Sequence, residues 1–250
     1  MSQKKIVIIP TYNEIENVSD IVERVMALPG NFEVLIIDDG SPDGTAQVVR
    51  SMQIVHPTRI HLMERSGKMG LGTAYIAGFK HALAKGYEYI FEMDADFSHN
   101  PDDLVRLYEA CAVQGYDMAI GSRYITGVNV VNWPMGRVLM SFFASKYVQL
   151  ITGIPIKDTT AGFKCYHRTV LEAINLDEIR FIGYAFQIEM KFTAWKLGFN
   201  IVEVPIIFTD RTRGSSKMSK HIFREAVFGV IYMKVKSWFK PYKINRTVSL

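Results

Sequence analysis

Hydrophobic and polar positions follow two alternating rhythms along the first half of the chain. Short apolar runs predict strands near 4–9, 33–38, 59–64, 88–93 and 117–122. Segments with a helical period lie between them and predict helices near 14–28, 43–55, 71–85 and 102–114. Strands that alternate with helices are typical of a mostly parallel sheet covered by helices on both faces, so this half is Rossmann-like.

The rhythm changes after residue 125. The pattern there predicts a helix near 135–152, a short strand at 163–166, a helix near 184–197 and a strand-like run over 200–209. No repeat, low-complexity tract or Pro/Gly linker marks a domain boundary, and 250 residues fit one domain. We therefore expect a single domain over residues 1–220, followed by a basic C-terminal helix or tail over 221–250.

Charge and cysteine content add information about the setting. The net charge is only +4, but basic residues gather between positions 217 and 243, where Glu225 is the single acid. Cys111 and Cys165 have no C-x-x-C spacing, which favours a reducing, cytosolic setting over a disulfide framework. The first apolar run is too short for a signal peptide, and no apolar stretch reaches the roughly 18 residues of a membrane-spanning helix. We expect a cytoplasmic protein.

Acidic residues follow the predicted strands at the place where ligands usually bind. In open α/β sheets, ligands sit beyond the carboxyl ends of the strands. The first strand leads into Glu14, the second into Asp38 and Asp39, and the fourth into Asp94 and Asp96. These carboxylates would repel one another unless a cation or hydrogen-bond donors met them.

The Asp94-Ala95-Asp96 triplet is the sharpest of these features. Two carboxylates one residue apart at a strand end suit a hard divalent cation that also holds a diphosphate. The alternative is that they cap the helix near Pro101, as a lone D-x-D often does, but the other acidic strand ends favour the metal. Asp38 and Asp39, together with Asp43, have their own alternative as a hydrogen-bonded turn before a helix.

Eight short segments together resemble a known family. In chain order they are PTYNE at 10–14, DDGSPDGT at 38–45, GLGTAY at 70–75, DADFSHNP at 94–101, GSRY at 121–124, DTTAGFK at 158–164, GYAFQIEM at 183–190 and RTRGSSKMSK at 211–220. With these segments the chain resembles the family 2 glycosyltransferases of the GT-A fold, and among them the polyprenol (dolichol) phosphate mannose synthases. The resemblance spans about residues 4–220. It implies a mixed, mostly parallel sheet flanked by helices.

The resemblance implies a donor site at the acidic edge. It places a nucleotide-sugar donor against Pro10, Tyr12, Glu14, Asp39, Asp94, Ala95, Arg211 and Lys217. It assigns Asp94 and Asp96 to Mg²⁺ or Mn²⁺, and it implies catalytic roles for Asp96, Arg123 and Arg211. Some family members carry a glutamine where this chain has Ser98, so the third metal ligand stays open.

The resemblance also implies that Arg123, Arg137 and Ser141 receive the phosphate of a polyprenyl phosphate. Guanidinium groups bind phosphate oxygens bidentately, and Ser141, four residues after Arg137, would share its helix face. The alternative for both arginines is a surface salt bridge, which the strand-end position of Arg123 disfavours. Asp158 either orients an acceptor-site arginine or caps a turn.

Two further matches have open alternatives. One loop resembles the family's flexible segment over the donor diphosphate, where a lid would exclude water, and it holds Arg211, Arg213, Ser215 and Lys217. Attraction of this basic loop to anionic lipid is the other interpretation. Gln187 and Glu189 match the family's F-Q-x-E stretch, or they are polar residues of a helix face in the core.

Two apolar segments favour contact with a membrane surface. Residues 221–242 interleave aromatic and aliphatic side chains with basic ones, as a helix in a headgroup layer does. Residues 133–151 show a similar apolar pattern. The alternative for the first segment is an ordinary terminal helix docked on the core. We expect peripheral association with the cytoplasmic face of a membrane, and no nucleic-acid partner.

These features predict an inverting glycosyltransferase that moves mannose from GDP-mannose to polyprenyl phosphate. A phosphate acceptor has a second pKa of about 6, so it is anionic near neutral pH and requires no catalytic histidine. The base and the sugar rest on the resemblance alone. A UDP-sugar donor, giving a glucosyl- or other sugar transferase, is the alternative.

Three other protein classes fit less well. Gly70-Leu71-Gly72 suggests a dehydrogenase, but Tyr75 stands where the third glycine of that motif belongs. The Asp38-Asp39 pair suggests a receiver-type signalling domain, but the chain is about twice too long for one. A non-catalytic nucleotide-sugar-binding module stays open, although the full acidic and basic sets argue against it.

Overall fold

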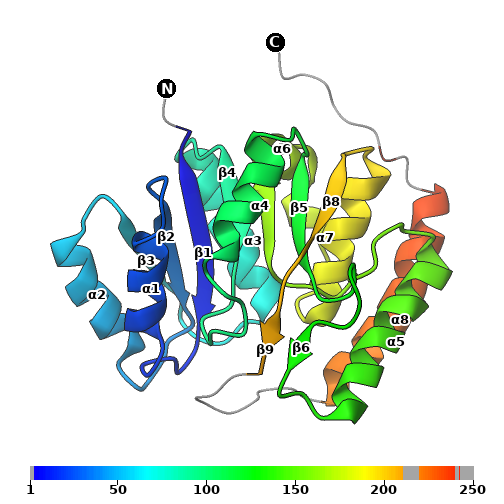
Figure 1. The fold of residues 1–250 in the computed structure, drawn as a ribbon, viewed down its shortest axis with the longest axis horizontal. Coiled ribbons are helices and arrows are strands. Elements are labelled where there is room, and N and C mark those ends of the chain that lie inside the picture. The colour runs from blue at the N-terminus through cyan, green and yellow to red at the C-terminus, as the bar shows by residue number, and fades with distance from the viewer. Residues whose placement is uncertain (1–2, 211–219, 240–241, 243–250) are drawn as a thin grey trace.

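The computed structural model describes residues 3–210, 220–239 and 242 and centres on a seven-stranded sheet with the order β3-β2-β1-β4-β7-β5-β8 (Figure 1). The strands are β1 (Lys5–Thr11), β2 (Glu33–Asp38), β3 (Ile60–Glu64), β4 (Tyr89–Glu92), β5 (Met118–Ser122), β7 (Lys164–His167) and β8 (Ile201–Pro205). All pairings in this sheet are parallel except those of β7, which runs antiparallel to both β4 and β5. The prediction of a mixed, mostly parallel sheet is confirmed.

Helices cover both faces of the sheet. One face packs against α1 (Val18–Met26), α2 (Thr45–Val55) and α4 (Asp103–Ala112), and the other against α3 (Leu71–Ala84), α6 (Arg168–Ala173) and α7 (Tyr184–Lys196). In β1, Ile6 and Ile8 join the core beneath α3 and α7, whereas Val7 and Ile9 join the core beneath α1 and α4. Both faces of β1 are therefore buried, which explains why its sequence is a continuous apolar run.

Two long helices lie side by side beyond the β8 edge, as Figure 1 shows for α5 (Met135–Thr152) and α8 (Lys220–Phe239). Val148 of α5 and Val230 and Met233 of α8 belong to the core that also contains α3 and α7. The predicted basic C-terminal helix is therefore docked on the core through one of its faces. In the part of the chain that the structure describes, no helix is both long and apolar enough to cross a bilayer.

The first helix begins later than the pattern predicts, at Val18 instead of near residue 14. Asn13 has a φ of 54°, which lies in the left-handed region and cannot start a right-handed helix. The next backbone amides point to the neighbouring loop, because Glu14 N donates to Thr45 Oγ1 and Ile15 N donates to Asp43 Oδ2. These contacts with the loop before α2 hold residues 14 and 15 in a turn, and the helix begins after it.

The strand-like run over 200–209 divides into two strands. The run leaves the large sheet after Pro205 and resumes as β9 (Phe208–Thr209), which pairs with β6 (Val130–Val131) in a second, two-stranded sheet. The sequence did not predict β6, α6 or the 3₁₀ helix η1 (Leu176–Glu178), because such short elements give no periodic signal. This small sheet places the segment after β5 beside the end of the 200–209 run.

A fully buried ion pair fixes the antiparallel strand. Lys164 of β7 lies in register with Glu92 of β4, and its Nζ is 3.1 Å from Glu92 Oε2. The Tyr166 hydroxyl donates to Glu92 Oε1 at 2.7 Å, and Gln187 Nε2 donates to Glu92 Oε2 at 2.8 Å. Burial lowers the pKa of Lys164, and the charge of Glu92 opposes that shift. Each charge of the pair is thus compensated by the other, and Tyr166 and Gln187 donate further hydrogen bonds to the carboxylate, as a buried ion pair requires.

The variant Lys164→Met tests this pair, because it keeps a long side chain but leaves the Glu92 carboxylate buried without its cation. Breaking a buried ion pair from one side costs about 3–5 kcal/mol. We expect urea unfolding at pH 7 to show a loss of that size in the free energy of unfolding.

The matched control is Lys80→Met, which removes a lysine from the exposed pair with Asp177. Exposed pairs contribute less than about 1 kcal/mol, so this variant should unfold nearly as the wild type does. Equal losses in the two variants would contradict a special role for the buried pair.

Candidate functional site

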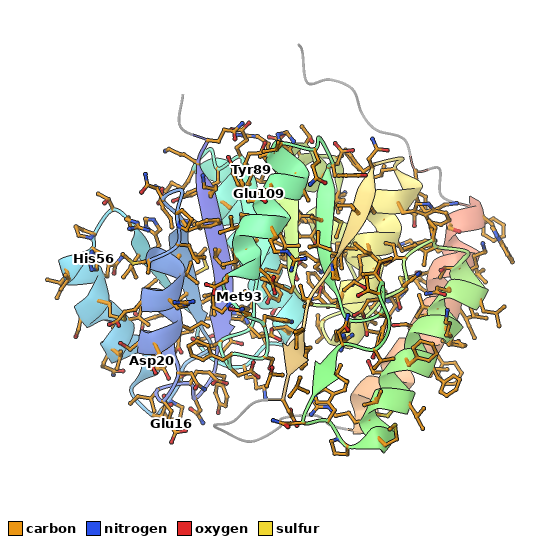
Figure 2. All side chains as sticks on the ribbon, viewed as in Figure 1. Glu16, Asp20, His56, Tyr89, Met93 and Glu109 are labelled. Atoms are coloured by element: carbon orange, nitrogen blue, oxygen red, sulfur yellow. The ribbon has the colours of Figure 1, made fainter. Side chains whose placement is uncertain are left out.

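The predicted acidic residues meet at one edge of the sheet. Strands β1, β2, β4 and β5 all end there, because they run in the same direction. In Figure 2, Tyr89 and Met93 mark the two ends of the β4 segment, and Glu16 lies toward the Met93 side. Lys164, at the start of antiparallel β7, joins this same edge. The edge therefore collects carboxylates from several loops together with one buried lysine.

Two aspartates, one at the end of β2 and one in the loop that follows, hold loops together. Asp38 Oδ1 accepts a hydrogen bond from Ser41 N at 2.9 Å. Asp43 accepts from Thr45 N at 3.0 Å and from Ile15 N at 3.1 Å, at the start of α2. Burial acts to raise the pKa of Asp43, but these hydrogen bonds outweigh it and lower the pKa. Both aspartates fit the alternative of a hydrogen-bonded turn.

Asp39 is held by an arginine. Arg65 binds both carboxylate oxygens, with Nε 2.6 Å from Oδ1 and Nη2 2.7 Å from Oδ2, and this bidentate pair is almost fully buried. The remaining Arg65 nitrogen, Nη1, donates to Thr73 Oγ1 at 2.8 Å. Asp39 N also donates to Thr11 O at 3.0 Å, which places Asp39 beside the exit of β1.

The other predicted donor residues lie along that exit. Pro10 is half-buried near the end of β1, and Tyr12 and Glu14 follow in the half-buried turn. The ammonium of Lys68 lies 5.2 Å from the centroid of the Tyr12 ring. The structure therefore brings Pro10, Tyr12, Glu14 and Asp39 together, while their contacts with a nucleotide stay a prediction.

The Asp94-Ala95-Asp96 triplet, the predicted metal site, follows β4. Asp96 is buried, and both the backbone N and the hydroxyl of Ser98 donate to its Oδ1, at 3.0 Å for the backbone N. The side chain of Asp94 is 39% exposed. Phe97 has a φ of 58°, and backbone strain of this kind is stored where the surroundings enforce it, often at functional sites. One aspartate is therefore fixed and the other is open to solvent.

These two carboxylates fit a hard divalent cation, because Mg²⁺ and Mn²⁺ prefer oxygen ligands. Among residues 3–210, 220–239 and 242, no group of three or more His, Cys, Asp or Glu side chains forms a metal cage. In proteins, Mg²⁺ is often bound by one or two carboxylates together with substrate phosphates and water. Ser98, at the open third position, uses its hydroxyl to orient Asp96.

His99 lies beside Asp94 and packs against two phenylalanine rings. Its ring stacks on Phe163 with centroids 4.8 Å apart and meets the edge of Phe208 at 5.2 Å. Its Nδ1 lies 3.5 Å from Asp94 N. Burial lowers the pKa of His99 to about 4, so the imidazole is neutral at physiological pH. His99 therefore contributes packing to the site and no positive charge.

Arg123 is locked by a buried carboxylate. Its Nε lies 2.7 Å from Asp158 Oδ2 and its Nη2 lies 2.6 Å from Asp158 Oδ1, while Nη2 also donates to Thr160 Oγ1 at 2.8 Å. Burial acts to raise the pKa of Asp158, but the charge and hydrogen bonds of Arg123 outweigh it and lower the pKa. Of the two roles proposed for Asp158, the structure shows contact with the arginine.

One indole ring lies against both arginines of the predicted acceptor site. The centroid of Trp133 is 4.3 Å from Arg137 Cζ and 5.5 Å from Arg123 Cζ. Arg137 Nη1 donates to Asp210 Oδ1 at 2.8 Å, and these two side chains are 29% and 27% exposed. Both guanidinium groups therefore lie against the same ring, that of Trp133. It also gives Arg137 the salt bridge that was its alternative.

The remaining predicted site residues fall into two groups. Ser141 is half-buried in α5, one turn after Arg137. Outside the described residues lie Arg211, Arg213, Ser215 and Lys217, so their roles stay predictions.

Gln187 and Glu189 are polar residues of the core. Gln187 donates to Glu92 in the buried cluster. Glu189 accepts from Arg180 N at 2.9 Å and from Phe181 N at 3.0 Å, and burial raises the pKa of Glu189. The structure favours the core interpretation for both residues.

Five residues of this edge were not predicted from the sequence: Arg65, His99, Trp133, Lys164 and Asp210. Arg65 gave a usable signal, since it follows the third strand as the acidic residues follow the others. Lys164 and Asp210 gave none, because their partners depend on strand β7 and on the small sheet.

Comparisons with known proteins agree with this geometry. The family model described as "Glycosyl transferase family 2" matches residues 6–174. A polyprenol monophosphomannose synthase of Mycolicibacterium smegmatis is 47% identical over 245 residues, which cover 98% of this chain and 90% of the relative. An undecaprenyl-phosphate mannosyltransferase of Micrococcus luteus is 45% identical over 223 residues, which cover 89% of this chain and 90% of the relative.

Solved structures resemble the fold at low sequence identity. Glucosyl-3-phosphoglycerate synthase of Mycobacterium tuberculosis, in complex with Mn²⁺, UDP and glucosyl-3-phosphoglycerate, matches with a TM-score of 0.66 at 15% identity over 93% of this chain and 80% of that chain. A mannosyltransferase of Pyrobaculum calidifontis, in complex with GDP-Man and Mn²⁺, matches with a TM-score of 0.60 at 18% identity over 95% and 64%. The predicted GT-A fold is confirmed.

The variant Asp158→Asn tests the buried partner of Arg123 through its dependence on pH. The native pKa of Asp158 lies below its ordinary value of 3.8, so the carboxylate stabilises the fold above that value and loses this contribution as the pH falls through the native pKa. We expect the variant to lose about 3 kcal/mol at pH 7, measured by urea unfolding, and the gap to the wild type to shrink below about pH 4.

Asp102→Asn serves as the control, because Asp102 forms an exposed pair with Arg24. Its free energy of unfolding should differ from that of the wild type by less than about 1 kcal/mol at pH 7. A gap for Asp158→Asn that stays constant down to pH 3 would show that the carboxylate charge does not stabilise this site.

Proposed function

Because the chain belongs to glycosyl transferase family 2, we propose that this glycosyltransferase moves mannose from GDP-mannose to the phosphate of polyprenyl phosphate. One observation carries the acceptor side of the proposal. Arg123 and Arg137 share the ring of Trp133 at the edge of the sheet that also holds Asp94 and Asp96. Two guanidinium groups beside a metal-type carboxylate pair suit a reaction between a diphosphate donor and a phosphate acceptor. The names of the two relatives support the same lipid class.

The donor lies, in this proposal, across the loops that follow β1, β2 and β4. The buried Asp39–Arg65 pair gives the nucleotide wall a fixed polar group, and Tyr12 supplies a half-buried ring nearby. Asp94 and Asp96 would hold Mg²⁺ or Mn²⁺, and the Mn²⁺ complexes of the structural neighbours support a divalent cation. When bound, the cation neutralises the negative charge that develops on the leaving diphosphate.

Arg211 and Lys217 are the proposed further contacts to the donor. Both belong to the segment that resembles the family's flexible loop, and each would add positive charge near the diphosphate. A UDP-sugar remains the alternative donor, since one structural neighbour binds UDP and the other GDP-Man.

The acceptor attacks directly in this proposal. Arg123 and Arg137 hold the lipid phosphate, and an oxygen that is already anionic near neutral pH attacks the anomeric carbon. The new carbon–oxygen bond forms as the bond to the diphosphate breaks on the opposite side, so the anomeric configuration inverts. Asp158 keeps the Arg123 guanidinium in place, and no side chain needs to remove a proton.

A membrane surface completes the set of proposed partners. Along the outside of α5 and α8, apolar side chains are exposed at Leu139, Phe143, Leu150, Phe228, Ile231, Trp238 and Phe239. An exposed apolar stretch of this extent marks an interaction surface, and aromatic rings favour the headgroup layer. We place this helix pair on the cytoplasmic face of a membrane, where it would meet the lipid acceptor.

A panel of GDP- and UDP-sugars with a short polyprenyl phosphate and Mn²⁺ tests the function, with the lipid product scored by mass spectrometry. We expect GDP-mannose to give an inverted mannosyl phospholipid. Product formed with a UDP-sugar and not with GDP-mannose would show that the donor is a UDP-sugar. Binding without any product would support the non-catalytic module.

Asp96→Asn probes the metal pair in the same assay. Loss of a cation ligand should lower the rate at least about 100-fold, because a bound metal supplies several kcal/mol of transition-state stabilisation. Asp102→Asn, at an exposed aspartate, should keep the wild-type rate. Equal rates for Asp96→Asn and the wild type would refute the metal assignment.

Membrane contact predicts that the double variant Trp238→Ser/Phe239→Ser binds vesicles at least about tenfold more weakly, because it removes two exposed aromatic side chains. Co-sedimentation with vesicles that contain anionic lipid measures this. The matched control is Ile54→Ser/Val55→Ser, whose side chains are as exposed but lie in α2, at the opposite end of the sheet (Figure 1). Equal losses in both double variants would contradict a specific membrane face.

A further inference from the structure

The two acceptor-site arginines each contact a carboxylate, and these carboxylates differ in burial. Asp158 is completely buried and binds two nitrogens of the Arg123 guanidinium. Asp210 is partly exposed, and its Oδ1 accepts a hydrogen bond from Arg137 Nη1 at 2.8 Å. Both positive charges are therefore compensated before any phosphate arrives.

We propose that Asp210 occupies Arg137 in place of the acceptor phosphate and is displaced by it. Asp210 thereby acts as an internal competitor that lowers the affinity of Arg137 for the acceptor phosphate. The proposal rests on the proposed function, because it takes Arg137 as a ligand of the lipid phosphate.

Electrostatic repulsion makes the exchange necessary. A phosphate monoester carries a charge of about −1.5 to −2 at pH 7. If it bound Arg137 while Asp210 remained, two anions would share one guanidinium in a site partly shielded from water, where like charges repel strongly. The dianion is the stronger partner of the arginine, so the single carboxylate gives way.

The two carboxylates differ in whether they can leave. Moving Asp158 away from Arg123 would strand a charge inside the protein, which is strongly unfavourable. The Asp210 carboxylate is 27% exposed, so water can solvate it once the contact breaks. The exchange therefore takes place at Arg137, while Arg123 stays fixed.

The surroundings of Asp210 keep the rest of the site in place during the exchange. Asp210 N donates to Val131 O at 3.0 Å, which holds its backbone against β6. Trp133 packs against Phe208 of β9 with centroids 5.1 Å apart, and it lies 4.3 Å from the Arg137 guanidinium. This stacking does not depend on the Asp210 carboxylate. The exchange therefore moves the Asp210 carboxylate while Trp133 stays in place.

The consequence is a lower affinity for the phosphorylated lipid and an unchanged affinity for a lipid without phosphate. A prenyl alcohol has the same apolar chain but brings no charge that can replace Asp210 on Arg137.

The variant Asp210→Asn tests the exchange, because it keeps the shape of the side chain and removes the competing charge. Isothermal titration with geranyl phosphate, and separately with geraniol, measures binding without requiring transfer. We expect the variant to bind geranyl phosphate about threefold more tightly than the wild type, the gain that follows from removing a partly exposed ion pair. Its affinity for geraniol should not change.

The same substitution in an Arg137→Gln background is the decisive control. The gain must vanish there if it acts through Arg137. Asp177→Asn removes a negative charge from the exposed pair with Lys80 and should leave geranyl phosphate binding at the wild-type level. A thermal unfolding scan of each variant confirms folding, and Asp210→Ser replaces Asp210→Asn if the latter is unfolded.

Weaker or unchanged binding of geranyl phosphate by Asp210→Asn would overturn the exchange, as would an equal gain in the Arg137→Gln background. Failure of the proposed function looks different. If the wild type makes no glycosylated lipid but Asp210→Asn still binds geranyl phosphate more tightly, the exchange stands and the transfer reaction does not. If the wild type does not bind geranyl phosphate at all, both proposals fall.

Discussion

The buried pair between Glu92 and Lys164 is the constraint on which the rest of the site depends. It secures β7 between β4 and β5 in the antiparallel sense, so the loop that precedes β7 reaches the edge where the other strands end. That loop supplies Asp158. The register that pairs Lys164 with Ile120 also sets where β5 ends, and Arg123 emerges there beside its buried partner. A parallel strand in this position would have sent the same loop to the opposite edge.

Charge compensation explains how so acidic an edge can fold. Asp38 and Asp43 are satisfied by loop amides and hydroxyl groups, and Asp39 by the bidentate Arg65. Asp94 and Asp96 have a different environment. The carboxylate of Asp94 is exposed, and that of Asp96 is held by a hydrogen bond from Ser98 N. The structure therefore separates aspartates that hold loops together from the two whose oxygens suit a cation.

Much of the fold was predictable, because it depends on local patterns. The apolar runs of β1 to β5 and the helical periods between them appear in the structure within a few residues, and the family and the GT-A fold are confirmed. Boundaries failed where contact with another loop holds the backbone in a turn, as before Val18. Strand β7 was expected, but its antiparallel direction was not, since four residues carry no signal of orientation.

The site was predictable in its residue types and not in its pairings. Carboxylates at strand ends and arginines near them can be read from the sequence, because topology alone gathers strand ends. The partner of each charge depends on contacts between distant segments, such as Asp210 with Arg137 across 73 positions. For the same reason the contact of Trp133 with two guanidinium groups could not be predicted from the sequence. The predicted roles in catalysis and binding stay predictions.

Helix α5 connects the two halves of the proposed acceptor site. Its first turns carry Arg137, which faces Trp133 and Asp210, and the exposed side chains of Leu139 and Phe143. A lipid phosphate is fixed to its apolar chain, so an enzyme that binds both must present charge and apolar surface within a short distance. If α5 rests on the membrane by its apolar side, Arg137 lies near the depth of the headgroups, where a polyprenyl phosphate presents its charge. One helix then sets both the height of the enzyme on the membrane and the position of its phosphate ligand.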